Sequence, residues 1–183
     1  MKTTGLILAG GRGSRVGGAD KGLLNWEGGT LVDAVLARFA PQVDQVLISC
    51  NRNLEQYAQR AATVSDELAD FQGPLAGLCA ALPQCKTELI ITVPCDCPNL
   101  PLNLVSRLIQ QLHSGNYELC YAHDGEREQY LFSALHKGCE QRLRDYLAGG
   151  GRSVRGWHET LRVVQEDFSD VGAHFRNLNT LGT

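Results

Sequence analysis

The sequence predicts an α/β fold in which a mostly parallel sheet is covered by helices on both faces, giving three layers. Short apolar runs alternate with amphipathic stretches along the chain, which is the pattern of repeated βαβ units. Two of these runs predict central strands: Thr3–Leu8 has a nearly continuous apolar end, as strands buried on both faces do, and Glu88–Val93 is largely apolar. The length of 183 residues suits one domain, which we expect to span residues 1–183.

The individual elements follow from local signals along the chain. Thr30 is a good N-cap for the first helix, with Asp33 three residues later, and Pro74 suits the first position of the third helix. Apolar residues at helical spacing mark the other helices. The predicted strands are 3–8, 45–50, 63–64, 88–93, 118–122, 130–136 and 162–165. The predicted helices are 30–39, 54–62, 74–82, 101–113, 138–147 and 153–160.

Composition excludes several classes of protein. A formal net charge of -3 argues against a general nucleic-acid binder, and no apolar run approaches the roughly 18 residues of a membrane helix. The N-terminus does not resemble a signal peptide, so we expect a cytoplasmic protein. The seven cysteines are then best explained as free, buried thiols. A zinc site at Cys95 and Cys97 is disfavoured, because no second cysteine pair or close histidine stands at zinc spacing.

Ligands of parallel sheets bind at the carboxyl ends of the strands, and a glycine-rich loop follows the first strand. Glycines let backbone N–H groups approach an anion closely, while Arg12, Arg15 and Lys21 supply positive charge. The spacing fits neither a Walker A loop nor a dinucleotide fingerprint. The loop therefore predicts a triphosphate site of another kind, with a plain flexible turn as the alternative.

Polar residues also follow the other strands. Asn51 and Asp66 come after the second and third strands, where they fit either nucleotide contacts or ordinary turn residues. Asp96 follows the apolar run 88–93. Because aspartate is rarely buried unless it is paired, we expect Asp96 to carry Mg²⁺, with a structural role as the alternative.

Four segments together resemble one family. They are "LAGGRGSRVGGADKGLL" at 8–24, "GPLAGL" at 73–78, "VPCDCPNLP" at 93–101 and "FRNLNT" at 175–180. The chain resembles the GT-A-like nucleotidyltransferases, which have a Rossmann-like nucleotide-binding fold, and in particular the molybdenum cofactor guanylyltransferases. The resemblance is weak from about 123 to 170, and the tail that usually follows the last motif is missing here.

The resemblance implies that the protein transfers GMP from GTP to the terminal phosphate of molybdopterin or molybdenum cofactor, releasing pyrophosphate. It implies Mg²⁺, or Mn²⁺, on Asp96, and catalytic roles for Arg15 and Lys21 on the phosphates. The N-terminal half would bind the nucleotide and the C-terminal half the acceptor. The implied binding residues are Leu8, Ala9, Gly10, Gly11, Lys21, Asn51, Asp66, Gly77, Asp96, Asn177 and Asn179.

Several readings stay open. The acceptor could instead be a sugar phosphate or another small phosphate, or the chain could be a non-catalytic GTP-binding module that delivers cofactor. Arg127 and Arg155 could bind the pterin phosphate or be solvated, and Trp157 could stack on the pterin or pack in the core. We expect a monomer that makes transient contacts with cofactor-synthesis proteins or molybdoenzyme chaperones.

Overall fold

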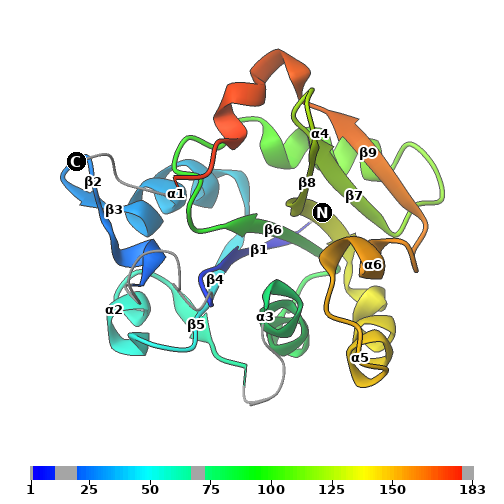
Figure 1. The fold of residues 1–183 in the computed structure, drawn as a ribbon, viewed down its shortest axis with the longest axis horizontal. Helices are drawn as coiled ribbons and strands as arrows, with labels where there is room; N and C mark the ends of the chain where they lie inside the picture. The colour runs from blue at the N-terminus through cyan, green and yellow to red at the C-terminus, as the bar shows by residue number, and fades with distance from the viewer. Residues whose placement is uncertain (1, 11–19, 67–72, 179–183) are drawn as a thin grey trace.

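A seven-stranded sheet runs through the molecule in the order β5-β4-β1-β6-β8-β7-β9, seen in the computed structural model in Figure 1. The structure describes residues 2–10, 20–66 and 73–178. Strands β1, β4, β5 and β6 are mutually parallel, β7 and β9 are parallel to each other, and β8 is antiparallel to both of its neighbours. The strands are β1 Thr3–Leu8, β4 Gln45–Ser49, β5 Ala62–Val64, β6 Leu89–Pro94, β7 Leu119–His123, β8 Glu128–His136 and β9 Val163–Asp167. A two-stranded ribbon pairs β2 Asn25–Trp26 with β3 Gly29–Thr30.

Helices cover both faces of this sheet, which confirms the predicted three layers. In Figure 1, α1 and α4 lie on one side of the sheet, and α3, α5 and α6 lie on the other. The helices are α1 Leu31–Phe39, α2 Leu54–Ala58, α3 Pro74–Ala81, α4 Leu104–Leu112, α5 Glu140–Ala148 and α6 Val154–His158. The 3-10 turns are η2 Lys21–Leu23, η3 Ala40–Gln42, η4 Leu82–Gln84, η5 Lys137–Cys139 and η6 Ser169–Phe175.

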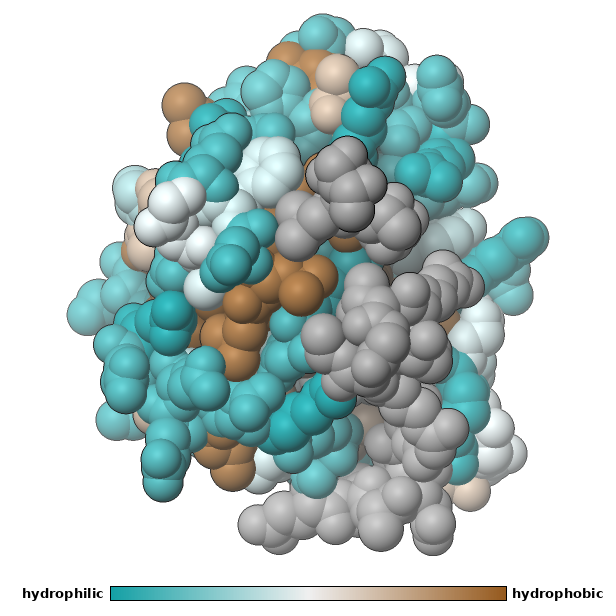
Figure 2. Space-filling view, turned by 60° about the vertical axis from the view of Figure 1, so that its left-hand side comes forward, coloured by the Kyte–Doolittle hydropathy of each residue, from teal (hydrophilic) through white to brown (hydrophobic). Residues whose placement is uncertain are grey.

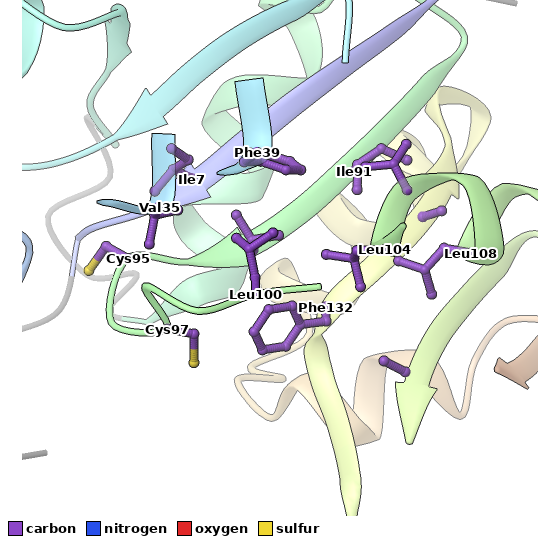
Figure 3. Close-up of a cluster of buried hydrophobic side chains, with 14 of the residues drawn as sticks. Ile7, Val35, Phe39, Ile91, Cys95, Cys97, Leu100, Leu104, Leu108 and Phe132 are labelled. Atoms are coloured by element: carbon purple, nitrogen blue, oxygen red, sulfur yellow. The ribbon is translucent and has the colours of Figure 1, made fainter. Parts of the chain in front are cut away.

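Two apolar cores lie on the two faces of the sheet. Because successive side chains of a strand point to opposite faces, Ile7 belongs to one core while Leu6 belongs to the other. Figure 3 shows the core that α1 and α4 cover, where Phe39 and Phe132 are fully buried. Cys95 stands at one end of this cluster, on the segment that follows β6, so the polar residues after β6 are held by a packed core.

The predicted elements are confirmed with small shifts, except for one helix that is too long in the prediction. The helix expected at 54–62 ends at Ala58, because the chain turns there and Ala62 joins β5. In this turn the N–H groups of Arg60 and Ala61 both donate to the carbonyl of Tyr57. The guanidinium of Arg60, which lies in this turn, pairs with the carboxylate of Asp33 in α1 at 2.7 Å. The β2–β3 ribbon and η6 are additions that the sequence did not predict.

The surface of the described residues is largely hydrophilic on the face that Figure 2 shows, with a group of apolar side chains near its centre. Within the described ranges, no helix has the length and apolar character needed to cross a membrane.

Candidate active site

A cavity of about 200 Å³ opens at the edge of the sheet where β1, β4 and β6 end and α3 begins. This is the edge at which parallel sheets bind their ligands. Its lining includes most of the residues predicted for the site, brought together from segments far apart in the sequence. The lining residues are Leu8, Ala9, Gly10, Lys21, Ser49, Asp66, Gly73, Pro74, Gly77, Pro94, Cys95, Asp96, Leu131 and Asn177.

Four predicted residues, Gly11, Arg12, Arg15 and Asn179, lie outside the residues that the structure describes. Asn51 is described but does not line the cavity; instead its Oδ1 accepts a hydrogen bond from the Asp66 N–H at 3.1 Å. This bond ties the end of β4 to the segment after β5. The nucleotide contact expected of Asn51 therefore stays a prediction.

The backbone at the end of β1 is fixed by both neighbouring strands. The Ala9 N–H donates to the Ser49 carbonyl at 2.8 Å, and the Cys95 N–H donates to the Leu8 carbonyl at 3.2 Å. The Ala9 amide hydrogen is thus engaged within the protein. The backbone expected to hold the nucleotide continues past these two hydrogen bonds. Gly10 is the first described residue after them.

Gly77 brings α3 close to the sheet beside the cavity. A Cβ at this position would clash with the Ser49 hydroxyl and lie 3.1 Å from Ser49 Cβ. That Gly77 leaves space for a guanosine stays a prediction. The structure adds a second reason for the glycine, which is the close packing of α3 against the end of β4.

The central charges of the site are Lys21 and Asp96, which lie 75 residues apart in the sequence and form an ion pair. Lys21 Nζ is 2.5 Å from Asp96 Oδ2, and their side chains are 24% and 12% exposed. Lys21 begins η2, and Asp96 is the second residue after β6. A carboxylate at the end of a buried strand is therefore balanced by a cation within the cavity.

Asp96 also fits a divalent metal ion. Mg²⁺ is commonly held by one or two carboxylates together with substrate phosphate oxygens, and Asp96 offers one carboxylate in a cavity large enough for phosphates. The ammonium group beside Oδ2 shows that this oxygen is placed to receive positive charge. The donor set of the described residues thus suits a metal that arrives with a nucleotide.

The thiols around Asp96 do not form a metal site in the described part of the chain. There, no group of three or more histidine, cysteine, aspartate or glutamate side chains could hold an ion, and all seven cysteines are free and buried. Burial, reinforced by Asp96, raises the pKa of both Cys95 and Cys97, so these thiols stay protonated. The prediction of free, buried thiols is confirmed.

The segment before the C-terminus lies beside Asp96. The Leu178 N–H donates to the Asp96 carbonyl at 3.0 Å, and the Cys97 thiol donates to Asn177 Oδ1 at 2.6 Å. These contacts bring Asn177 to the cavity, where its expected binding role stays a prediction. They connect residue 177 to the loop after β6 across 80 residues of sequence.

Other candidates lie away from the cavity lining. Arg155 pairs with Glu159 on the surface at 2.9 Å, and Arg127 lies 3.7 Å from Asp124. Trp157 is only 1% exposed and belongs to the core that α3 and α5 cover, which favours its packing role. Sequence reasoning missed Leu131 and Ser49 in the lining, and no local motif marks either of them.

Comparison with known proteins assigns the family. A family model described as "MobA-like NTP transferase domain" matches residues 5–163. This chain belongs to the MobA-like NTP transferase family. Relatives of this MobA-like chain include the molybdenum cofactor guanylyltransferases of Mannheimia succiniciproducens and Cupriavidus metallidurans. Both are 44% identical to it, over 96% and 97% of this chain and 93% and 90% of theirs.

Solved structures confirm the fold of this MobA-like chain as that of the GT-A-like nucleotidyltransferases. Molybdopterin-guanine dinucleotide biosynthesis protein A from Archaeoglobus fulgidus superimposes with a TM-score of 0.80 at 21% identity, covering 97% of this chain and 92% of that one. The 4-diphosphocytidyl-2C-methyl-D-erythritol synthase of Anaerococcus prevotii gives 0.69 at 13% identity, covering 98% and 93%. Because neighbours with different names share the fold, the fold does not decide the substrate.

Proposed function

We propose that this MobA-like chain transfers GMP from GTP to the terminal phosphate of molybdopterin or molybdenum cofactor. The products are the guanine dinucleotide form of the cofactor and pyrophosphate. Relatives that are 43–44% identical over more than 90% of both chains carry the name molybdenum cofactor guanylyltransferase, which supports this reaction. The observation that carries the proposal is the cavity at the strand ends, in which Lys21 and Asp96 face each other.

The reaction needs alignment and charge neutralisation more than proton transfer. An oxygen of the acceptor phosphate forms a bond to the α-phosphorus of GTP, and the bond from that phosphorus to the bridging oxygen breaks. Pyrophosphate leaves with the electron pair. The acceptor oxygen is already a competent nucleophile, so the chain does not need a covalent intermediate. Lys21 would neutralise the phosphates, and Arg15, outside the described residues, would share this role.

We propose Mg²⁺, or Mn²⁺ in its place, as the metal that Asp96 would hold. When bound, it would supply a positive charge on the phosphate oxygens during the transfer. Asp96 follows β6, whose residues are all buried, so its carboxylate is held in a fixed place while substrates exchange. Asn177 and Leu131 would contribute to the acceptor side of the same cavity. This assigns nucleotide binding to the N-terminal half and acceptor binding to the C-terminal half of one domain.

Pyrophosphate release tests the whole assignment. The reaction would be run with Mg²⁺ and with GTP, CTP or ATP, each in the presence and absence of molybdopterin. Release that requires both GTP and molybdopterin is the expected result. Release that requires a sugar phosphate or another small phosphate instead would replace the acceptor. GTP binding without release, with every acceptor tried, would favour a module that delivers cofactor without catalysis.

We further propose that the protein acts in the cytoplasm as a monomer, with transient contacts to cofactor-synthesis proteins or molybdoenzyme chaperones. Light scattering of the purified protein tests the monomer directly. A mass of about twice that calculated from the 20.0 kDa chain would contradict it.

A further inference from the structure

The residues on both sides of Lys21 contact one buried tyrosine of α2. The Tyr57 hydroxyl donates to Asp20 Oδ1 at 2.6 Å, although the two residues are 37 positions apart. On the other side of Lys21, a Cβ at Gly22 would clash with the same hydroxyl oxygen. The residues before and after Lys21, Asp20 and Gly22, therefore both pack against the Tyr57 hydroxyl.

A second bond holds the other oxygen of the Asp20 carboxylate. Asn53 Nδ2 donates to Asp20 Oδ2 at 3.0 Å. Asn53 precedes α2 with a φ of +52°, a left-handed conformation that asparagine adopts more readily than most residues. The N-terminal turn of α2 thus presents two donors, from Asn53 and Tyr57, to one carboxylate.

The bond from Tyr57 is the stronger of the two anchors. Tyr57 is 0% exposed, so its hydroxyl would be costly to leave without an acceptor, whereas Asn53 is exposed to water. Burial and the hydrogen bond to Asp20 raise the pKa of the Tyr57 phenol. The phenol therefore keeps its proton and remains a donor at every pH at which the enzyme would work.

We infer that Tyr57, acting through Asp20, is a positioning residue that sets where Lys21 places its ammonium group. Asp20 is the residue directly before η2, and its carbonyl accepts from the Leu23 N–H at 3.1 Å. The carboxylate that Tyr57 holds and the turn that carries Lys21 thus belong to one unit. From this unit Lys21 reaches Asp96 in the cavity.

This inference rests on the proposed role of Lys21 in binding the nucleotide phosphates. Transfer reactions depend on placement, and a shift of about 1 Å in a positioned group can cost about 10²-fold in rate. The contacts also give a physical reason for the sequence Asp20-Lys21-Gly22. The carboxylate anchors the turn, the lysine enters the cavity, and the glycine leaves space for the Tyr57 hydroxyl.

A double-mutant cycle separates positioning from simple packing. The kcat/KM for GTP would be measured by pyrophosphate release in four proteins: the natural chain, Tyr57→Phe, Lys21→Met and the double variant. GTP affinity would be measured by calorimetry on the same four. We expect Lys21→Met to lower kcat/KM by about 10² or more, as for other groups that stabilise charge in the transition state. We expect Tyr57→Phe alone to lower it by about tenfold, and by less than about twofold when Lys21 is already replaced.

Two further proteins complete the design. Asp20→Ala removes the oxygen that accepts from the Tyr57 hydroxyl and is expected to reproduce Tyr57→Phe. Tyr146→Phe is the matched control, because the Tyr146 hydroxyl also donates a hydrogen bond, to the Ser153 carbonyl at 3.1 Å, and Tyr146 does not line the cavity. Its kcat/KM should equal that of the natural chain. Urea unfolding of every variant would show that each protein is folded.

Each result has one meaning. If Tyr57→Phe lowers kcat/KM equally with and without Lys21, or not at all, Tyr57 is a packing residue and the inference is overturned. If Lys21→Met leaves both kcat/KM and GTP affinity unchanged, the role of Lys21 is wrong and the inference fails with it. If the natural chain binds GTP but releases no pyrophosphate, the proposed reaction fails. The affinities of the four proteins would then decide the positioning role by the same comparison.

Discussion

Replacing Asp96 with asparagine should nearly abolish turnover while the chain remains folded. The change keeps the shape of the side chain and removes its charge, so it tests the charge alone. In the structure the carboxylate lies 2.5 Å from Lys21 Nζ, and the two side chains are 12% and 24% exposed. This exposure places the pair between a surface salt bridge and a fully buried one. We therefore expect the substitution to lower the free energy of unfolding by about 1–2 kcal/mol.

The expected loss of rate is larger than this loss of stability. Removing a group that stabilises charge in the transition state costs about 10²–10³-fold in rate, equal to about 2.7–4 kcal/mol. Domains are typically stable by about 5–15 kcal/mol, so a loss of 1–2 kcal/mol leaves most of the protein folded. The two magnitudes predict a folded protein that is nearly inactive.

The assay combines two measurements on Asp96→Asn. Pyrophosphate release at saturating GTP and molybdopterin gives the rate, and urea unfolding gives the stability. Asp145→Asn serves as the control, because Asp145 accepts a bond from Gln141 on the exposed face of α5. A folded Asp96→Asn protein with a rate within about threefold of the natural chain would refute the assignment of charge stabilisation to this carboxylate.

Three further predictions follow from the contacts of the site and its surroundings. Gly77→Ala should lower the free energy of unfolding by about 1–3 kcal/mol, because the added methyl group would clash with Ser49. Adding Ser49→Gly to this variant should restore much of the lost stability, whereas an unchanged urea midpoint for Gly77→Ala would contradict the clash. Burial lowers the pKa of His158 to about 4, so below pH 6.5 the unfolded chain takes up a proton that the folded chain does not. The free energy of unfolding should therefore fall by about 2–3 kcal/mol from pH 7.5 to pH 4.5. His158→Phe should reduce this dependence on pH, and an equal dependence in the variant would contradict the prediction. Without nucleotide, the Lys21→Met variant should bind Mn²⁺ at least about tenfold more tightly than the natural chain, because the ammonium group no longer competes for Asp96. Electron paramagnetic resonance would measure the free Mn²⁺, and equal affinities of the two proteins would contradict this competition.

The sequence predicted those parts of the molecule that depend on local signals. The apolar runs located β1 and β6 and therefore the sheet edge, and the position of Asp96 after β6 placed it in the cavity. The direction of β8 was not predicted, although the connection from His123 to Glu128 is too short for the crossover that parallel strands require. That short connection was the available signal.

Long-range side-chain contacts were beyond sequence reasoning. Tyr57 and Asp20 are 37 residues apart, and no spacing rule links a helical tyrosine to a carboxylate in a loop. Ser49 likewise enters the site only because α3 packs against the end of β4 at Gly77. The end of α2 was missed because Ala62 pairs with β4 as part of β5, and this long-range pairing overrides the local helix propensity.

The reversed direction of β8 has a consequence for how this molecule could change its acceptor. At the edge where β1 and β6 end, β8 begins, so Leu131 enters the cavity from the early part of a strand. The tight turn between β7 and β8, residues 124–127, leads into that part of β8. Lengthening or exchanging this turn would remodel the Leu131 side of the cavity, which we propose receives the acceptor, and would leave the Lys21–Asp96 pair in place. The β7–β8 hairpin is therefore a place where the acceptor could be changed without altering the proposed nucleotide site.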